Sequence, residues 1–344
     1  MRILIAGQGL AGSILAFSLL RKGVDVLVVD QGQELISSRI AAGILRPVTG
    51  RRMVKTANAD NVVPFAFEFY DWIATQTGIN SFYRKDSLQL FASASSRNDW
   101  YVRSEDPGYP HYIGAFISEA EIDDSLNSPF GGVILKQCGY LDTNAFLNGC
   151  REKLMQIGSY QSGFVDWQTV SGNSKSLQWE NKKFDRVVFC EGVAFSDLFR
   201  FVQFKPVKGE LFEFYAPELN EDRIIQSGNF ILPLGNGKFR AGATYDWTNL
   251  NTDKTTEARE LITNWIAKTI RVPFEITGHA AGIRPATVDR RPAIGFHQSY
   301  PRLALFNGLG SKGVMLAPFY GAQLANAILE QGNIDSDCDL NRFA

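Results

Sequence analysis

The feature that most constrains the fold lies in residues 1–30, where an apolar run, a glycine loop, a helical segment and a second apolar run follow one another. Residues 2–6 (RILIA) suit a buried strand, and residues 10–22 suit a helix with an apolar face. Residues 24–29 (VDVLVV) form the second apolar run, which Asp30 ends. This order predicts a β-α-β unit of the kind that binds a dinucleotide.

The glycine loop of this unit has the spacing G-x-G-x-x-G, at Gly7, Gly9 and Gly12. Gly7 permits the tight turn, Gly9 lets the backbone approach a pyrophosphate, and Gly12 lets the helix pack on the strand. The helix N-terminus offers backbone N–H groups and a partial positive charge to phosphate. Asp30 is expected to accept hydrogen bonds from ribose hydroxyls, and its charge disfavours a 2′-phosphate.

The same spacing recurs at Gly308, Gly310 and Gly313, between an apolar run at 303–306 and a helical segment at 314–332. Only twelve residues follow this segment, too few and too polar for the second buried strand that an independent nucleotide site needs. We therefore expect this loop to hold another part of the same cofactor. A second anion-stabilising helix N-terminus favours FAD over NAD, because a reduced flavin carries negative charge around its pyrimidine ring.

Composition narrows the class of partner. The 344 residues include 35 Lys plus Arg and 36 Asp plus Glu, so no bulk charge attracts nucleic acid or a membrane surface. Apolar runs stay below the roughly 18 residues of a membrane helix. The four cysteines and three histidines lack metal-type spacing, which predicts a reducing compartment and no metal. Arg21 and Lys22 end the first apolar segment, so we do not interpret this segment as a signal peptide. The prediction is a cytoplasmic protein with neither a nucleic-acid nor a membrane partner.

Seven segments, in order, resemble the superfamily of FAD-dependent D-amino-acid, glycine and sarcosine oxidases. The family's opening resembles residues 7–30, and its two closing motifs resemble AGIRPATVDRRPAIG (281–295) and GLGSKGVMLAP (308–318). The segments between them are SSRIAAGILRP (37–47), GYLDTNAFLNGCREKL (139–154) with the expected strand GFVDW (163–167) after it, FDRVVFCEG (184–192) and FILPLGNGKFRAGATYDW (230–247).

The resemblance implies an α/β plus α+β fold, with a discontinuous Rossmann-type FAD-binding domain and a mostly antiparallel substrate domain that covers the flavin. Alternation in residues 209–215 (GELFEFY) and a turn at Gly235-Asn236-Gly237 agree with the antiparallel part. The expected FAD-binding domain comprises residues 1–80, 138–205 and 280–344, and the substrate domain comprises 81–137 and 206–279.

Two further segments have helical spacing, residues 63–78 and 256–270. The first is rich in aromatics, and a flavin-stacking role for them is disfavoured because helical spacing already explains the pattern. The side chains expected to face the core are Phe65, Phe69, Trp72 and Ile73 in the first, and Leu261, Ile262, Trp265 and Ile266 in the second.

The family's cofactor contacts carry over to a long set of positions. FAD is expected to be noncovalent, because the cysteine that bonds the flavin in sarcosine oxidases has no counterpart in the two closing motifs. The implied cofactor-binding residues are Gly7, Gly9, Leu10, Ala11, Gly12, Asp30, Gln31, Ser38, Arg39, Ala41, Ala42, Gly43, Val165, Cys190, Gly192, Gly282, Arg284, Gly308, Leu309, Gly310, Ser311, Lys312 and Gly313.

Arg284 and Lys312 are the expected catalytic residues. In relatives with the AGIRP-type motif the arginine binds the substrate carboxylate, and a planar guanidinium suits this because it donates two parallel hydrogen bonds. The alternative is a surface ion pair between Arg284 and Asp289. Ser311 stands where glycine-oxidase-like relatives carry an arginine, and Lys312 either restores that charge beside the flavin or faces solvent.

A basic loop follows the flavin-facing segment, with Arg46, Arg51, Arg52 and Lys55 and no acid among them. Two interpretations stay open: an electropositive entrance for acidic substrates, and the commoner case of a solvated basic loop. Arg46, Arg284 and Phe230 form the expected substrate-binding set.

The function implied is an FAD-dependent oxidoreductase that oxidises the C–N bond of an amino acid or secondary amine. A hydride passes to flavin N5 and the imine product hydrolyses, so orientation and electrostatics suffice without a strong base. The electron acceptor is O₂ or an electron carrier. The alternatives are an amine oxidase acting on a tRNA side chain, which the neutral charge disfavours, a non-catalytic flavin-binding protein, and an NAD-dependent dehydrogenase.

Overall fold

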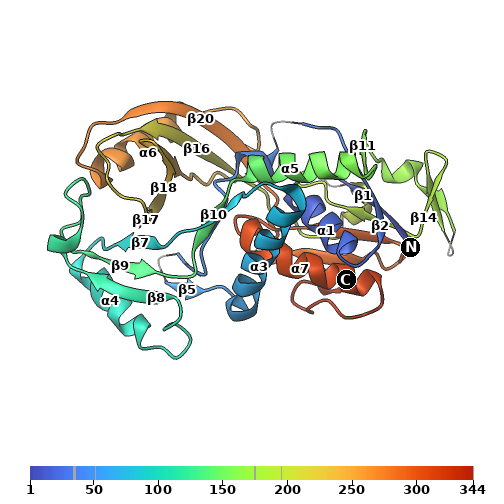
Figure 1. Ribbon diagram of the computed structural model, residues 1–344, viewed down its shortest axis with the longest axis horizontal. Coiled ribbons are helices and arrows are strands. Elements are labelled where there is room, and N and C mark those ends of the chain that lie inside the picture. The colour runs from blue at the N-terminus through green and yellow to red at the C-terminus, as the bar shows by residue number, and fades with distance from the viewer. Residues whose placement is uncertain (34–35, 51, 174–175, 195, 344) are drawn as a thin grey trace.

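The computed structural model describes residues 1–33, 36–50, 52–173, 176–194 and 196–343. Two large sheets organise the protein (Figure 1). A six-stranded sheet lies near both termini, and an eight-stranded sheet fills the opposite end of the long axis. The fold is a mixed α/β fold with one mainly parallel and one mainly antiparallel sheet, as predicted.

The six-stranded sheet contains the predicted β-α-β unit. Its strands, in spatial order, are β11 (Tyr160–Ser162), β2 (Asp25–Asp30), β1 (Arg2–Ala6), β15 (Arg186–Phe189), β22 (Leu303–Asn307) and β21 (Ala293–Phe296). The first five are parallel, and β21 closes the sheet antiparallel to β22. Strand β1 leads through α1 (Leu10–Leu20) to β2 on one side, and β15 lies on its other side. Such a reversal of strand order opens a crevice at the carboxyl ends of the strands, where ligands bind in open α/β sheets.

The helices nearest the two chain ends pack against each other. A Cβ on Gly321 of α7 (Gly313–Ile328) would lie 3.0 Å from the Ile14 side chain, and one on Gly313 would lie 3.0 Å from Leu10. Because Leu10 and Gly313 each begin a helix, the two helix N-termini lie together. Figure 1 shows α1 and α7 side by side, with α3 (Ala59–Thr77) crossing α7.

The eight-stranded sheet forms the other half. In spatial order it contains β20 (Glu275–Arg284), β16 (Val207–Tyr215), β19 (Lys238–Gly242), β18 (Asn229–Gly235), β17 (Ile224–Ser227), β7 (Ser87–Leu90), β9 (Gly132–Leu135) and β8 (Ile113–Ile117). Only β7 and β17 pair in parallel. The predicted hairpin joins β18 to β19 through Asn236 and Gly237, whose φ angles of 52° and 71° match a type I′ turn.

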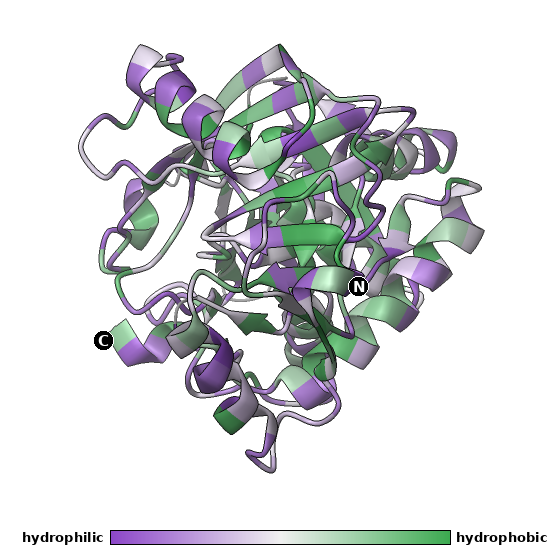
Figure 2. Ribbon diagram, turned by 90° about the vertical axis from the view of Figure 1, so that its left-hand side faces the viewer, coloured by the Kyte–Doolittle hydropathy of each residue, from purple (hydrophilic) through white to green (hydrophobic). Residues whose placement is uncertain are grey.

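The remaining elements connect or cover these sheets. They are α2 (Ser37–Ile40), α4 (Ala94–Ser104), α5 (Thr143–Gln156) and α6 (Thr256–Thr269), a small sheet of β3 (Ile44–Leu45), β10 (Gly139–Leu141) and β6 (Phe82–Arg84), the pair β4 (Val48–Thr49) and β5 (Val54–Lys55), and a sheet of β12 (Ser171–Gly172), β13 (Leu177–Trp179) and β14 (Lys182–Phe184). The short 3₁₀ turns are Glu119–Glu121, Trp167–Thr169, Asp197–Phe199 and Leu340–Phe343. Hydrophobic residues colour the inner strands in Figure 2, and hydrophilic residues gather on outward helix turns and loops.

Three expectations need correction. GFVDW is not a strand: β11 ends at Ser162, and the Asp166 carboxylate caps a 3₁₀ turn by accepting from the Gln168 N–H. Leu261 points to solvent at 55% exposure, while Ile262 and Ile266 are buried, so the apolar stripe of α6 is narrower than predicted. Helix α4 lies inside residues 81–137, which were expected to belong to a mostly antiparallel sheet, and Ser93 caps it by accepting from the Ser96 N–H.

The first aromatic helix agrees better with its prediction. Phe69 and Ile73 are buried, and Phe65 and Trp72 pack partly buried against the same core. The helix α3 begins at Ala59, before the predicted start, and ends at Thr77. Its Tyr70 hydroxyl donates to the Val314 carbonyl at 2.7 Å, which fixes α3 to the first turn of α7.

The two sheets are the basis on which we propose the two-domain division given above. Across the described ranges, no helix has both the length and the apolarity needed to span a membrane. The same ranges contain no cluster of three or more His, Cys, Asp or Glu side chains arranged to hold a metal ion.

Candidate functional site

A cavity of about 1620 Å³ lies between the carboxyl edge of the six-stranded sheet and one face of the eight-stranded sheet. Small-molecule pockets usually measure about 300–1,000 Å³, so this one has room for an extended cofactor and a substrate. Its walls come from segments far apart in the chain, including the loop after β1, residues 36–46, strands β16 and β20, and the loop before α7.

The loop after β1 exposes bare backbone to this cavity. A Cβ on Gly7, which has φ of 100°, would lie 2.6 Å from the Cys190 carbonyl oxygen, and a Cβ on Gly12 would overlap the Gly7 carbonyl. Gly9, Leu10 and Ala11 line the cavity. The start of α1 therefore lies at the cavity, where its backbone N–H groups other than that of Leu10 can receive an anion.

Asp30 ends β2 at the same edge and is held rigidly. Its carboxylate accepts from the Gln8 N–H at 2.8 Å and the Gly32 N–H at 2.7 Å, and Arg151 of α5 pairs with it at 3.3 Å. Arg151 also donates to the Gln8 side chain at 2.9 Å. These contacts orient the carboxylate and leave acceptor capacity for ribose hydroxyls.

The segment after β2 passes directly in front of the first loop. Ser38 Oγ accepts from the Leu10 N–H at 3.0 Å, which joins α2 to the start of α1. Gly43 has φ of 76°, and a Cβ there would overlap the Leu141 carbonyl. Ala41 and Ala42 present small side chains to the cavity. The chain can therefore run close to a long ligand.

The second glycine loop reaches the cavity from the other chain end. Leu309 to Gly313 line it, and α7 begins there without a side-chain cap. Lys312 Nζ donates to Thr56 Oγ1 at 3.0 Å, so the lysine faces inward instead of into solvent. Burial lowers the pKa of Lys312, and repulsion from Arg46 and Arg290 lowers it further.

Most predicted site residues meet in this one cavity, and three do not line it. Gly12 lies beneath Gly7, Gly308 packs against Thr287 and Ala293, and Arg39 turns to Asn144 of α5 at 3.2 Å. The predicted residues that line it are Gly7, Gly9, Leu10, Ala11, Asp30, Gln31, Ser38, Ala41, Ala42, Gly43, Arg46, Val165, Cys190, Gly192, Phe230, Gly282, Arg284, Leu309, Gly310, Ser311, Lys312 and Gly313.

Arg284, at the end of β20, lies on the cavity face of the eight-stranded sheet. Its Nη1 donates to the Thr244 carbonyl at 3.3 Å, and its guanidinium lies 4.7 Å from the Tyr245 ring centre. Gly209 of the neighbouring β16 makes room for it, because a Cβ there would overlap the guanidinium. Burial lowers the pKa of Arg284, as expected for a desolvated cation.

The predicted alternative for this arginine is not what the structure contains. Asp289 pairs with Arg342 at 2.9 Å and accepts from the Arg291 N–H. Arg284 instead faces the cavity from the sheet.

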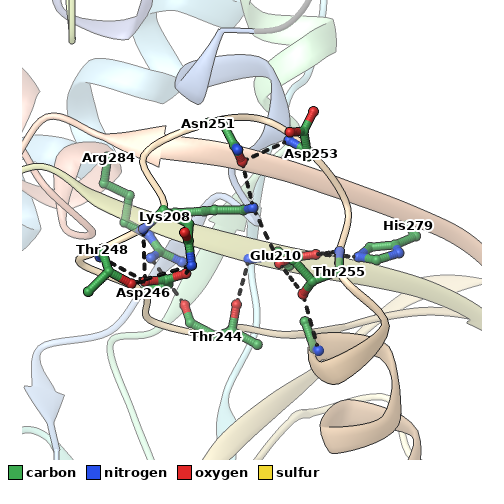
Figure 3. Close-up of polar contacts among 12 residues, drawn as sticks. Lys208, Glu210, Thr244, Asp246, Thr248, Asn251, Asp253, Thr255, His279 and Arg284 are labelled. Carbon is green, nitrogen blue, oxygen red and sulfur yellow. Dashed lines mark hydrogen bonds and ion pairs between the residues drawn. The ribbon is translucent and has the colours of Figure 1, made fainter.

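A buried polar network lies behind Arg284 on the opposite face of β16 (Figure 3). Lys208 and Glu210 flank Gly209, so strand alternation directs them away from the cavity; they are 1% and 3% exposed. Glu210 accepts from Thr255 Oγ1 at 2.7 Å and contacts His279 Nε2 at 2.7 Å, and Lys208 donates to Asn251 at 2.9 Å.

This network holds the loop of residues 243–255 against the sheet. Lys208 and Asp246 exchange two backbone hydrogen bonds, of 2.8 and 3.0 Å. The loop carries Thr244 and Tyr245, both in contact with Arg284, and Trp247. Tyr245 and Trp247 line the cavity as a stacked pair, 55% and 50% exposed.

Different residues of the basic loop agree with different interpretations. Arg46 lines the cavity, whereas Arg52 is exposed and does not line it. Lys55 pairs with Asp60 at 2.8 Å. Arg51 lies outside the described residues.

Four of the cavity residues that sequence reasoning missed bear on the chemistry of the site. Gly209 stood inside a predicted strand, and Tyr245 and Trp247 stood at the end of a predicted hairpin. Glu191 follows Cys190 at the end of β15, and burial raises the pKa of its carboxyl to about 7. The one signal for Glu191 in the sequence was its position, as an acid directly after a buried strand that ends beside the first glycine loop.

Comparisons with known proteins agree with this geometry. Residues 2–327 match the family model described as "DAO: FAD dependent oxidoreductase". The tRNA 5-methylaminomethyl-2-thiouridine biosynthesis bifunctional protein MnmC of Marinobacter nauticus is 25% identical over 370 residues, covering 96% of this chain and 56% of that protein. This chain thus spans about half the length of such curated relatives.

Solved structures share the fold. Glycine oxidase from Bacillus cereus superposes with a TM-score of 0.82 at 17% identity, covering 98% of this chain and 99% of that one. Iminodiacetate oxidase from Chelativorans superposes with a TM-score of 0.79 at 17% identity, covering 100% and 98%. At such identities the likeness establishes the fold alone.

Proposed function

This chain belongs to the DAO family of FAD-dependent oxidoreductases, and from that membership we propose that it oxidises the C–N bond of an amino acid or a secondary amine. FAD, when bound, supplies the two-electron acceptor for the Cα hydride of such a substrate. The resulting imine hydrolyses in water. We propose that the cofactor is held noncovalently.

The residues of the cavity fit FAD. The bare backbone of Gly7 and Gly9 and the start of α1 suit a pyrophosphate, and Asp30 suits a ribose. The start of α7 is a second site for negative charge in the same cavity, adjacent to the first through the Leu10–Gly313 contact. We propose that this second helix end faces the flavin ring.

The observation that carries the substrate assignment is the position of Arg284. Its guanidinium is desolvated, its one described hydrogen bond goes to a neutral carbonyl, and it faces the cavity shared by both glycine loops. An arginine in this state binds a carboxylate through two charge-assisted hydrogen bonds. We propose that it fixes the substrate with its Cα–H directed at the flavin.

The chain's own contribution is orientation and exclusion of water. Among the described residues that line the cavity, none is a histidine, so the amine is expected to bind in its neutral form without a strong protein base. Positioning of a substrate alone lowers a reaction barrier by several kcal/mol, roughly 7–11 in favourable cases.

The test is a visible spectrum of the purified protein. We expect bound FAD, and we expect its absorbance to bleach when the substrate is added without oxygen. Replacing Arg284→Met should raise the KM for that substrate roughly 10- to 100-fold, the range of one charged hydrogen-bonded contact. A flavin that every amino acid and N-alkyl amine leaves oxidised would contradict the proposal.

A tRNA-side-chain amine oxidase is a second candidate, favoured by one observation. The cavity contains the half-exposed pair Tyr245 and Trp247, and aromatic faces stack with nucleobases. The related protein from Marinobacter nauticus is named for the biosynthesis of tRNA 5-methylaminomethyl-2-thiouridine. Filter binding with tRNA separates the candidates. If the protein binds tRNA and the Trp247→Ala variant does not, the result supports the tRNA candidate.

Several expectations remain predictions. The electron acceptor, O₂ or a carrier protein, is decided by reoxidation rates of the reduced enzyme in air and with artificial carriers. The cytoplasmic location also stays a prediction.

A further inference from the structure

We propose that the substrate carries two carboxylates, one bound by Arg284 and the other by a separate anion subsite formed by Arg46 and Lys312. This inference rests on the proposed function, because it names the substrate class for the same cavity. It predicts an amino diacid or an imino diacid in preference to a simple amino acid.

Positive charge exceeds negative charge in the cavity lining. The lining cations are Arg46, Lys205, Arg284, Arg290 and Lys312, and the lining acids are Asp30, Asp99 and Glu191. Asp30 already pairs with Arg151, Asp99 is exposed on α4, and the raised pKa of Glu191 makes it a weak anion near neutral pH.

Three of these cations, Arg46, Arg284 and Lys312, have no carboxylate partner among the described residues. Arg284 donates to the Thr244 carbonyl and Lys312 to the Thr56 hydroxyl, both neutral acceptors. Arg46 has no hydrogen bond or ion pair within the described ranges. Desolvated cations without counterions are costly, so a ligand that brings two anionic groups recovers more of that cost than a ligand that brings one.

Hydrogen bonds place the chain at Arg46 close to Lys312. The Thr56 hydroxyl accepts from Lys312 at 3.0 Å, and the Thr56 N–H donates to the carbonyl of Pro47, the residue after Arg46, at 2.8 Å. Repulsion from Arg46 lowers the pKa of Lys312 in accord with this placement. The proposed pyrophosphate position at Gly9 and Ser38 is elsewhere, at the start of α1. Arg46 lines the same cavity as Arg284 and Lys312 and is not among the described residues that contact the start of α1.

Tyr245 lies against the first anion site. Its ring covers the Arg284 guanidinium at 4.7 Å, and it is half exposed to the same cavity. A substrate with its amine between two carboxylates would place one at Arg284 and the other toward Arg46 and Lys312. A ligand with one carboxylate would leave Arg46 unpaired.

The experiment titrates the FAD-bound protein with unreactive acids and follows the flavin spectrum. Succinate and glutarate are compared with butyrate and pentanoate, which match them in length and carry one carboxylate. We expect the better diacid to bind roughly tenfold or more tightly than its monoacid, the range of one charged contact. Arg46→Met and Lys312→Met should each reduce this preference.

Arg97→Met is the matched control, because Arg97 is an exposed cation on α4 that does not line the cavity. It should keep the full diacid preference. Arg46→Lys gives a second variant that retains the charge, and it should keep part of the preference. FAD content and melting temperature of each variant show whether it has folded.

Two results would overturn the inference. One is equal affinity for mono- and diacids in the unaltered protein. The other is an Arg46→Met variant that weakens both ligand classes equally, since this indicates that both arginines grip one carboxylate.

Flavin reduction keeps this inference separate from the proposed function. Anaerobic reduction is measured with aspartate, glutamate and iminodiacetate against alanine and sarcosine. Reduction by the monocarboxylates alone overturns the diacid inference and leaves amine oxidation standing. Arg46-dependent diacid binding with no reduction by any amine supports the subsite and overturns amine oxidation.

Discussion

Arg284 depends on one residue that carries no side chain. Gly209 sits under its guanidinium on the adjacent strand, and a Cβ there would overlap the guanidinium group. Replacing Gly209→Ala should therefore displace the arginine and weaken binding of a carboxylate ligand roughly 10- to 100-fold. The measurement is the Kd from flavin spectral titration.

Gly278→Ala provides the comparison for this change. Gly278 lies on the neighbouring strand β20, where an added Cβ would lie 3.1 Å from the Glu213 Cβ and would not meet Arg284. Its effect on ligand affinity should be small. Equal losses in both variants would show that the sheet tolerates no added methyl group and would remove the special role of Gly209.

Glu191 gives the protein a pH-dependent stability. Burial raises the pKa of its carboxyl from 4.5 to about 7 in the folded state. The folded protein therefore binds more protons than the unfolded chain between these values, and stability falls as pH rises through that window. The full effect above it is roughly 3 kcal/mol at 1.36 kcal/mol per unit.

Glu191→Gln should flatten this dependence. Denaturant unfolding of the FAD-free protein at pH 5 and pH 8 measures it, with Glu191→Gln more stable than the unaltered protein at pH 8 and similar to it at pH 5. A stability gain that is the same at both pH values would show that the carboxyl titrates normally.

Single residues also show where sequence reasoning stops. Arg284, Lys312 and most of the motif glycines line one cavity, and they could be selected from the sequence because they stand in contiguous motifs. Gly209 was not found, since its role depends on the pairing of β16 with β20, which places Gly209 opposite Gly282 and beside Arg284. Strand register of this kind joins residues about 75 positions apart and leaves no local signal.

Among the elements, strand β16 has two different faces. Gly209 and Leu211 line the cavity, and Lys208 and Glu210 hold the 243–255 loop on the other face. Removing one member of a buried charge network leaves the others uncompensated, at a cost of roughly 3–5 kcal/mol. Glu210→Ala should therefore destabilise the protein by that amount in denaturant unfolding.

The loop should respond locally as well. Hydrogen exchange of residues 243–255 should accelerate in Glu210→Ala, because the Thr255 N–H and hydroxyl lose their acceptor. Glu213→Gln on the same strand is the control; Glu213 is a half-exposed partner of Arg240, and such pairs contribute roughly 0–1 kcal/mol. Unchanged exchange in Glu210→Ala would mean that other contacts hold the loop.

Element prediction succeeded where periodicity was long and failed where local capping decided. The helices α1, α3, α6 and α7 and the hairpin β18–β19 follow from apolar spacing and turn residues. The strand expected at GFVDW fails because Asp166 caps a turn there. Helix α4 was missed because Trp100 is its one buried residue, so its sequence lacks the periodic apolar pattern that predicts a helix.

For the protein as a whole, the two glycine loops should behave as one binding unit. Adding FAD should slow hydrogen exchange in residues 7–12 and 308–313 together, while β13 and β14, which do not line the cavity, should not change. At 100 times its Kd, FAD should stabilise the folded protein by about 2.7 kcal/mol. Protection of residues 7–12 alone would contradict this prediction, because it would show that the second glycine loop does not contact FAD.

The contact between Leu10 and Gly313 has a consequence for biosynthesis. A nascent chain emerges at about 5–20 residues per second and its early segments begin to fold first, yet the second half of the cofactor cradle is translated about 300 residues after the first. Strand β22, which pairs with both β15 and β21, is also translated late, just before α7. The cofactor should therefore bind only after α7 has been translated, and not while the early segments alone have folded.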